Sequence, residues 1–348
     1  MIIERRWARI SKLGRLAVAA GLMAGVGCSA APSAPQAARP PVNSAPLEIT
    51  ETAPAGSPNP GSMSTPRKAT PQPSSNPPSM PASAELPRGG REIFPHHRLV
   101  GYAGLTGAKT LGRLGTGPLD ARLVELKRRA NAYASGREIL PVLEVITTVV
   151  QRNPGRDGKY RYRISDDQIE TYYEAARQHE ALLLLNIQPG RSEFLPEAKA
   201  YEKWLKLPNV GVALDPEWAM DPGQRPGGLY GHTTGAELNQ IAGYLASLVD
   251  KYDLPEKVMV YHQVAASVVR KESGLKQHAG VVLIKSVDGL GPPRFKFKTY
   301  RAVNKTTPKF VHAGFKLFFT EDREDGGRLM SPEEVLTLKP RPEYVMHE

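Results

Sequence analysis

From Arg98 onward, short apolar runs alternate with longer segments whose apolar residues recur every three or four positions. This alternation is typical of repeated strand–helix units rather than of an all-β or all-α domain. Runs such as 181–185 and 281–284 are apolar throughout, as expected of parallel strands buried on both faces. We therefore predict eight strands: Leu99–Ala103, Ile139–Val145, Ala181–Gln188, Val210–Leu214, Lys257–Gln263, Gly280–Ser286, Phe310–Phe319 and Tyr344–His347.

Helices are predicted between these strands. Ser165, Thr234 and Ser331 are candidate N-caps, because their side chains can accept hydrogen bonds from the first helical turn. The connection after the sixth strand contains Pro292-Pro293 and the basic run 294–298, so it is expected to be the least helical. The predicted helices are Leu119–Ala134, Asp166–His179, Pro196–Leu205, Ala236–Tyr252, Ala265–His278 and Pro332–Leu338.

Composition divides the chain and bounds the folded part. Residues 29–90 hold 15 of the 32 prolines and no Phe, Tyr or Trp, which predicts a disordered Pro/Ser/Ala-rich tether. Residues 91–348 match the roughly 250 residues of one α/β barrel. The predicted fold class is therefore α/β, a single (β/α)8 TIM-like barrel. An open doubly wound sheet is the alternative.

The N-terminal segment 1–28 has the features of a secretory signal. Basic residues between Arg5 and Arg15 precede the uncharged run 16–27, which is too short to span a bilayer as a helix. The only cysteine, Cys28, follows that run directly. This arrangement resembles the lipobox of bacterial lipoproteins, which implies acylation of Cys28 and an extracytoplasmic protein anchored to the membrane by lipid. Gly25 stands where the lipobox usually has Leu, so cleavage just after Cys28 and secretion remain the alternative.

Charge and cysteine content exclude several functions. The net charge of +11 includes +4 in residues 1–28 and +6 in residues 91–348, with no clustered basic stripe, so we expect no nucleic-acid partner. A single cysteine rules out an internal disulfide and a cysteine-rich zinc site. His96-His97 has no acidic neighbour at ligand spacing, and the glycines of segment 112–117 do not follow dinucleotide spacing. We therefore expect neither a metal nor a cofactor.

The strongest chemical signal is the segment 211–218, Gly-Val-Ala-Leu-Asp-Pro-Glu-Trp. An apolar strand ending in Asp215-Pro-Glu217 places two carboxylates on one face, since side chains alternate with period two. Neighbouring carboxylates disfavour simultaneous ionisation, so the pKa of one rises and that group becomes a proton donor. The simpler interpretation is that Asp215 caps the next loop and Glu217 forms a salt bridge.

This segment resembles the fourth strand of the TIM-barrel family-18 chitinases and family-25 lysozymes. The resemblance implies that Glu217 is the proton donor and that Asp215 assists the acetamido group of the substrate. It covers about eight residues, and it departs from the chitinase pattern at Val210 and Ala213, where that pattern has acidic residues.

Other candidates follow from the rule that barrel active sites lie at the carboxyl ends of the strands. Glu144 is a candidate base or nucleophile, or a rim residue paired with Lys285. Lys285 and Lys316 are candidates for an anion such as phosphate, and segment 159–163 either lines the cleft or forms a hairpin with 149–152. The predicted substrate-binding residues are Tyr102, Gln188, Trp218, Tyr230, His262, Lys285 and Lys316.

These observations favour a cell-envelope lipoprotein whose barrel resembles a glycoside hydrolase and acts on an envelope or extracellular polysaccharide. In this hypothesis Glu217 is the general acid and Asp215 its partner, and the partners are a glycan and the membrane that holds the lipid. The alternative is a non-catalytic carbohydrate-binding or scaffold lipoprotein on the same fold.

Overall fold

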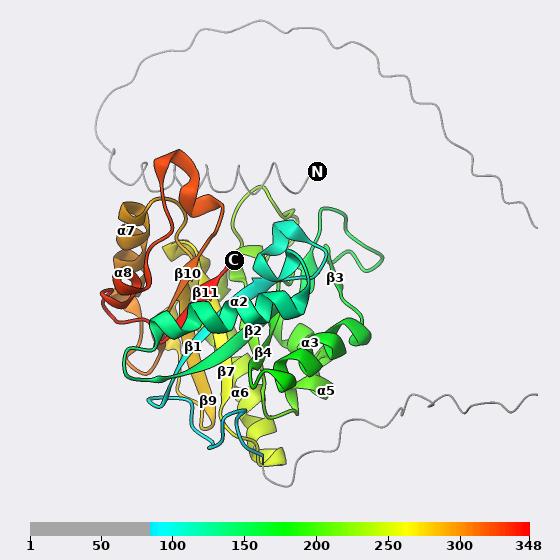
Figure 1. Ribbon diagram of the computed structural model, residues 1–348. Coiled ribbons are helices and arrows are strands. Elements are labelled where there is room, and N and C mark those ends of the chain that lie inside the picture. Colours follow the sequence, from blue (N-terminus) through cyan, green and yellow to red (C-terminus); the bar gives the residue numbers. More distant parts are fainter. Residues whose placement is uncertain (1–83) are drawn as a thin grey trace, which may run out of the picture. The chain divides into compact units, whose positions relative to one another are not determined.

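The computed structural model describes residues 84–348, and eight parallel strands in this part close into a barrel (Figure 1). The sheet closes because β1 (His97–Gly104) pairs with both β2 (Glu138–Val150) and β11 (Tyr344–His347). All eight predicted strands are confirmed, and the open doubly wound sheet is wrong. The other barrel strands are β4 (Leu182–Ile187), β5 (Val210–Leu214), β7 (Lys257–Gln263), β9 (Val281–Val287) and β10 (His312–Leu317).

Helices cover the outside of the barrel. Ser165 and Ser331 form capping boxes, and Thr234 accepts a hydrogen bond from the Glu237 N–H, so all three predicted N-caps are confirmed. The α-helices are α2 (Leu119–Ala130), α3 (Asp166–Gln178), α4 (Phe194–Ala200), α5 (Glu202–Leu205), α6 (Gly235–Tyr252), α7 (Pro293–Val303) and α8 (Pro332–Leu336).

The predicted helix Ala265–His278 is wrong. Two short 3-10 turns flank the two-residue strand β8 (Val269–Arg270), which pairs with β6 (Thr233–Thr234). The β-branched pair Val268-Val269 suits an extended segment better than a helix. Lys271 also adopts a left-handed backbone with φ of 51°, which interrupts any helical path.

The connection after β9 contains the helix α7, contrary to expectation. Pro293 occupies the first helical turn, where a missing N–H costs nothing because that position has no intrahelical acceptor. The apolar face of α7 is hard to recognise because one of its buried residues is Lys296. The Lys296 ammonium donates to the Lys316 carbonyl and to Asp322.

The barrel has two core layers, one on each face of the sheet. Outward side chains such as Leu183, Val212 and Phe315 pack against the helices. Inward side chains such as Leu140, Leu184 and Val260 fill the lower half of the barrel, toward the amino ends of the strands. The layers interleave because successive residues of a strand point to opposite faces.

Packing against the barrel begins before residue 91. Leu86 and Ile93 are buried in the same cluster as the inward strand residues, so the end of the predicted tether contributes to the core. Segment 1–28, Cys28 and most of the tether lie outside the described residues. Within residues 84–348, no helix is both long enough and apolar enough to cross a membrane.

Segment 159–163 forms a hairpin with the extended end of β2. The strand β3 (Arg161–Arg163) pairs antiparallel with Thr148–Val150, which confirms the hairpin alternative. The loop between the two strands projects from the body of the domain beside the β3 label in Figure 1.

Candidate functional site

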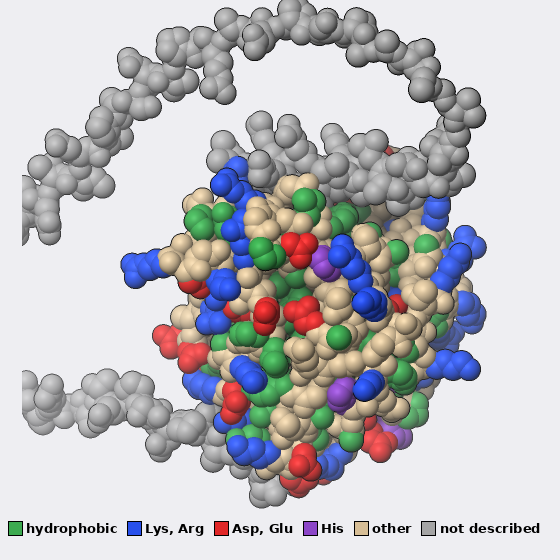
Figure 2. Space-filling model, turned by 180° about the vertical axis from the view of Figure 1, so that it is seen from behind, with side chains coloured by type: hydrophobic (Ala, Val, Ile, Leu, Met, Phe, Trp, Pro, Cys, Tyr) green, Lys and Arg blue, Asp and Glu red, His purple; other side chains and the backbone are tan. Residues whose placement is uncertain are grey.

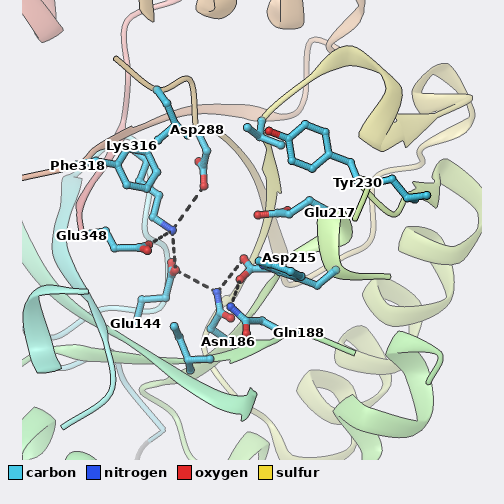
Figure 3. A pocket seen from close by; sticks show the side chains of 15 residues that line it. Glu144, Asn186, Gln188, Asp215, Glu217, Tyr230, Asp288, Lys316, Phe318 and Glu348 are labelled. Carbon is cyan, nitrogen blue, oxygen red and sulfur yellow. Dashed lines mark hydrogen bonds and ion pairs between the residues drawn. The ribbon is translucent and has the colours of Figure 1, made fainter. Parts of the chain in front are cut away.

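A pocket lies at the carboxyl ends of the barrel strands (Figure 3). Five carboxyl groups line it, together with one lysine, two amides and a mixed aromatic and aliphatic wall. The lining residues are Glu144, Ile146, Asn186, Gln188, Asp215, Glu217, Trp218, Leu229, Tyr230, Val264, Asp288, Leu290, Lys316, Phe318 and Glu348.

Most of the predicted site residues converge on this pocket. Seven of them line it directly, and His262 is fully buried against three of its carboxylates. The convergence follows from the parallel strands, whose carboxyl ends meet at one end of the barrel. The seven are Glu144, Gln188, Asp215, Glu217, Trp218, Tyr230 and Lys316.

Tyr102 and Lys285 do not reach the pocket, so their predicted position is wrong. Tyr102 packs in the outer core layer, where its hydroxyl donates to Glu125. Lys285 also points outward and donates to Glu272 and to the Val303 carbonyl. The residues directly before and after each of them on the strand face the barrel interior. Because adjacent side chains of a strand point to opposite faces, Tyr102 and Lys285 face outward.

Asp215 is held rigidly at the end of β5. The Asn186 amide donates to Asp215 Oδ1 at 3.0 Å, and the Gln188 amide donates to Oδ2 at 3.0 Å. Both amides come from β4 and its end, the neighbouring strand of the barrel. Each carboxylate oxygen of Asp215 therefore has a fixed neutral donor.

Glu217 lies in the 3-10 turn Pro216–Trp218 and points into the pocket (Figure 3). Its Oε2 atom is buried and has no hydrogen-bond partner among the described residues. Burial raises the pKa of Glu217 well above its ordinary value, and the nearby charges of Asp215 and Asp288 raise it further. A raised pKa favours the protonated, uncharged form of Glu217 over a wider pH range than for a solvated carboxyl group.

Glu144 is the centre of a buried polar network. It accepts hydrogen bonds from Tyr344 and from the Asn186 amide, and its Oε1 lies 3.1 Å from His262 Nε2. Burial by itself raises the pKa of Glu144, but the charges of His262 and Lys316 outweigh burial and leave it below its ordinary value. The alternative that Glu144 pairs with Lys285 at the rim is wrong.

His262 lies between carboxylates on both sides of its ring. Its Nδ1 is 2.8 Å from Asp288 Oδ2, and its Nε2 is 3.8 Å from Asp215 Oδ1. Burial opposes the charged form, but Asp288, Glu144 and Asp215 together raise the pKa of His262 well above its ordinary value. These three carboxylates therefore favour the charged imidazolium form of the ring over its neutral form.

Lys316 is enclosed by acids. Its Nζ lies 2.5 Å from Glu348 Oε2, 3.5 Å from Asp288 Oδ2 and 4.0 Å from Glu144 Oε1. With three carboxylates around it, Lys316 has little electrostatic capacity for an added anion. Lys285 lies on the outer face of the barrel sheet, whereas Lys316 lies inside. The two lysines therefore do not form the predicted phosphate site.

Two acidic residues of the pocket were not among the predicted site residues. Burial raises the pKa of Glu348 to about 7 in spite of its contact with Lys316. For Asp288, burial is outweighed by His262 and Lys316, which lower its pKa to about 2. Ile284 of β9 faces the barrel interior, so alternation along the strand places Ser286 and Asp288 on the same side, and this is the signal that points to Asp288.

The mouth of the pocket is largely aromatic and aliphatic. Trp218 follows the Asp-x-Glu segment directly, Phe318 follows β10, and Leu229 and Tyr230 come from the loop between β5 and α6. This loop therefore contributes to the wall of the pocket. His232 of the same loop contacts Arg270.

Among residues 84–348, no group of three or more His, Cys, Asp or Glu side chains is arranged to hold a metal ion. No family model and no curated protein matches the chain. Fold and pocket define a TIM-like barrel with a buried, acid-rich site at the carboxyl ends of its strands.

Proposed function

We propose that this protein cleaves a polysaccharide of the cell envelope or its surroundings, with Glu217 as the general acid and Asp215 as its partner. The observation that carries the proposal is Glu217 itself. A carboxyl group with a raised pKa and an unpartnered buried oxygen points into a pocket between a fixed carboxylate and aromatic side chains. An uncharged acid beside an ionised carboxylate is the pair that glycoside hydrolysis uses.

The chemistry follows from these positions. Glu217 donates its proton to the glycosidic oxygen as the bond from that oxygen to the anomeric carbon breaks. Positive charge develops on the sugar ring, and the fixed carboxylate of Asp215 stabilises it. Water then bonds to the anomeric carbon and returns a proton to Glu217, which restores the starting state.

The wall of the pocket suits a sugar. Flat faces such as those of Trp218, Tyr230 and Phe318 stack on the apolar faces of pyranose rings, while carboxylates and amides bind hydroxyl groups. Acylation of Cys28 would keep this activity outside the cytoplasmic membrane, close to envelope glycans.

The test is hydrolysis of purified peptidoglycan and of N-acetylglucosamine oligomers by wild-type protein and by Glu217→Gln. We expect kcat to fall about 10²- to 10⁴-fold in the variant, because a general acid contributes on that order. Asp221→Asn is the matched control, since Asp221 is a half-exposed acid of the adjoining loop that does not line the pocket. A wild type that is folded yet inert on both substrates would contradict the proposal.

A second candidate is carbohydrate binding without catalysis. It is favoured by the interior position Ala213, which faces the barrel core where the chitinase pattern has an acid. Here Glu217→Gln would leave binding of the oligomers unchanged, because a neutral Glu217 and a glutamine offer similar hydrogen bonds. Binding by isothermal calorimetry, measured beside hydrolysis, separates the two functions.

A further inference from the structure

A basic hairpin stands beside the mouth of the pocket. We use this name for residues 150–163, in which the loop from Arg152 to Lys159 is exposed throughout. The hairpin has five basic residues and one acidic residue, Asp157. Figure 2 shows basic side chains projecting from the edge of the molecule where the hairpin lies.

The base of the hairpin is neutralised and its loop is not. Arg161 and Arg163 both pair with the fully buried carboxylate of Glu197 at 2.8 Å, which fastens the hairpin to α4. Arg161 also pairs with Asp157 at 2.6 Å, so the acid of the loop is already engaged. By contrast, Arg152, Arg156 and Lys159 are in no ion pair with another described residue.

The hairpin extends directly from the pocket wall. The Val150 N–H donates to Gln188 Oε1 at 3.2 Å, and the same Gln188 amide holds Asp215. The Arg191 N–H donates to the Lys159 carbonyl at 2.7 Å. Between these contacts, Gly190 has φ of 62°, and a Cβ atom there would lie 2.2 Å from the Lys159 carbonyl oxygen. The hairpin is therefore fixed directly to the end of β4, whose Gln188 lines the pocket.

Side chains of the hairpin match a charged glycan better than a membrane. Arg191 stacks on the ring of Tyr160 at 4.5 Å, and the ring of Tyr162 in β3 is 45% exposed. The loop 152–159 contains no large apolar side chain that would enter a bilayer. Exposed cations bind a polyanion by releasing its counterions, and an exposed aromatic ring stacks on sugar.

We propose that the basic hairpin is a subsite for an anionic polysaccharide, one that carries phosphate, sulfate or carboxylate groups along its length. The subsite holds the polymer beside a pocket that accepts an uncharged or weakly charged sugar unit. This inference rests on the proposed function for its substrate class, and it adds that the polymer is anionic.

The test compares three proteins. One is wild type, and the second carries Arg152→Gln, Arg156→Gln and Lys159→Gln. The third, a matched control, carries Arg301→Gln, Lys305→Gln and Lys309→Gln, which removes the same charge from exposed residues in the last turn of α7 and in the segment between α7 and β10. Binding to dextran sulfate, polygalacturonate, uncharged dextran and phosphatidylglycerol vesicles is measured at two salt concentrations.

We expect wild type to bind the two anionic polymers and to bind dextran at least tenfold more weakly. The hairpin variant should lose about tenfold in affinity for the anionic polymers with a shallower salt dependence, and the control should change less than about twofold. Equal losses in the hairpin variant and the control would show a non-specific charge effect and overturn the inference. Hairpin-dependent binding to vesicles but not to the polymers would overturn it in favour of a membrane surface.

The same measurements distinguish this inference from the proposed function. If hydrolysis is absent while hairpin-dependent binding of anionic polymers persists, catalysis fails and the subsite stands. If neutral oligomers are cleaved and the hairpin variant binds anionic polymers as wild type does, catalysis stands and the subsite fails. Where anionic polymers are cleaved, the hairpin variant should raise KM and leave kcat unchanged.

Discussion

The two halves of the barrel interior are built on the same strands but differ in chemistry. The lower half holds Leu140, Leu184 and Val260, which are packed without a polar partner. The next inward-facing residues toward the carboxyl ends of the same strands, in the upper half, include Glu144, Asn186 and His262, which form a buried network. Apolar burial stabilises the lower half. Desolvation of the charged groups opposes folding in the upper half, where only mutual pairing offsets that cost.

This difference indicates where stability and function reside. Perturbed ionisable groups that cluster in a cleft are typical of functional sites. Five carboxyl groups around one pocket weaken folding unless cations and amides compensate them. The lower half supplies the rigidity on which that arrangement depends.

The largest expected effect on stability comes from removing a cation of the upper half. Lys316→Met leaves Glu348 and Asp288 buried with one partner fewer, so the free energy of unfolding should fall by about 3–5 kcal/mol. Chemical denaturation measures this change, with the exposed Lys309→Met as control. Adding Glu348→Gln to Lys316→Met should recover part of the loss. Equal free energies of unfolding for Lys316→Met and Lys309→Met would show that the ion pairs of Lys316 with the buried carboxylates do not contribute to stability.

A cavity in the lower half should cost nearly as much. Leu184→Ala removes a fully buried side chain from the interior cluster and should lower the free energy of unfolding by about 2–5 kcal/mol. The control is Leu229→Ala at the pocket mouth, where Leu229 is 48% exposed and the change should stay within about 0.5 kcal/mol. Similar losses in the free energy of unfolding for Leu184→Ala and Leu229→Ala would contradict the expectation that the lower core contributes more to stability than the pocket mouth.

The smallest effect concerns pH. Because the pKa of Glu217 is raised in the folded protein, its neutral form contributes stability that is fully present below the unfolded value of 4.5. That contribution is lost as pH rises toward the folded pKa. The free energy of unfolding of Glu217→Gln minus that of wild type should therefore grow with pH, by up to about 1.4 kcal/mol per pH unit between the unfolded and the folded pKa. Urea titrations at several pH values measure this difference, and a flat difference would place Glu217 in an ordinary, solvated environment.

The pattern of apolar residues predicts the barrel well because each strand is a short apolar run between polar segments. The same pattern predicts the helices less well, as α7 and segment 265–278 show. In α7 the buried Lys296 stands where an apolar residue is expected. In segment 265–278 the pairing of the short strand β8 with β6 outweighs the local helical periodicity.

The candidate site was predictable in part. Asp215 and Glu217 were identified because a carboxylate pair directly follows a strand, and strand ends share one side of the barrel. The predicted positions of Tyr102 and Lys285 are wrong because the apolar runs of β1 and β9 do not show which of the two alternating sets of side chains faces inward. No local pattern predicts the network of His262, Lys316 and Glu348, because its members come from separate segments that meet only in the folded barrel.

The amino-acid sequence by itself determined the number and order of the barrel strands and the residues at their carboxyl ends, because these depend on local apolar patterns. Tertiary structure alone decided which of those residues meet. Glu144 and Tyr344 lie 200 positions apart yet share a buried hydrogen bond. Such contacts arise only when closure of the sheet brings β2, β1 and β11 together, and closure also removes the carboxylates from water and so sets their charges.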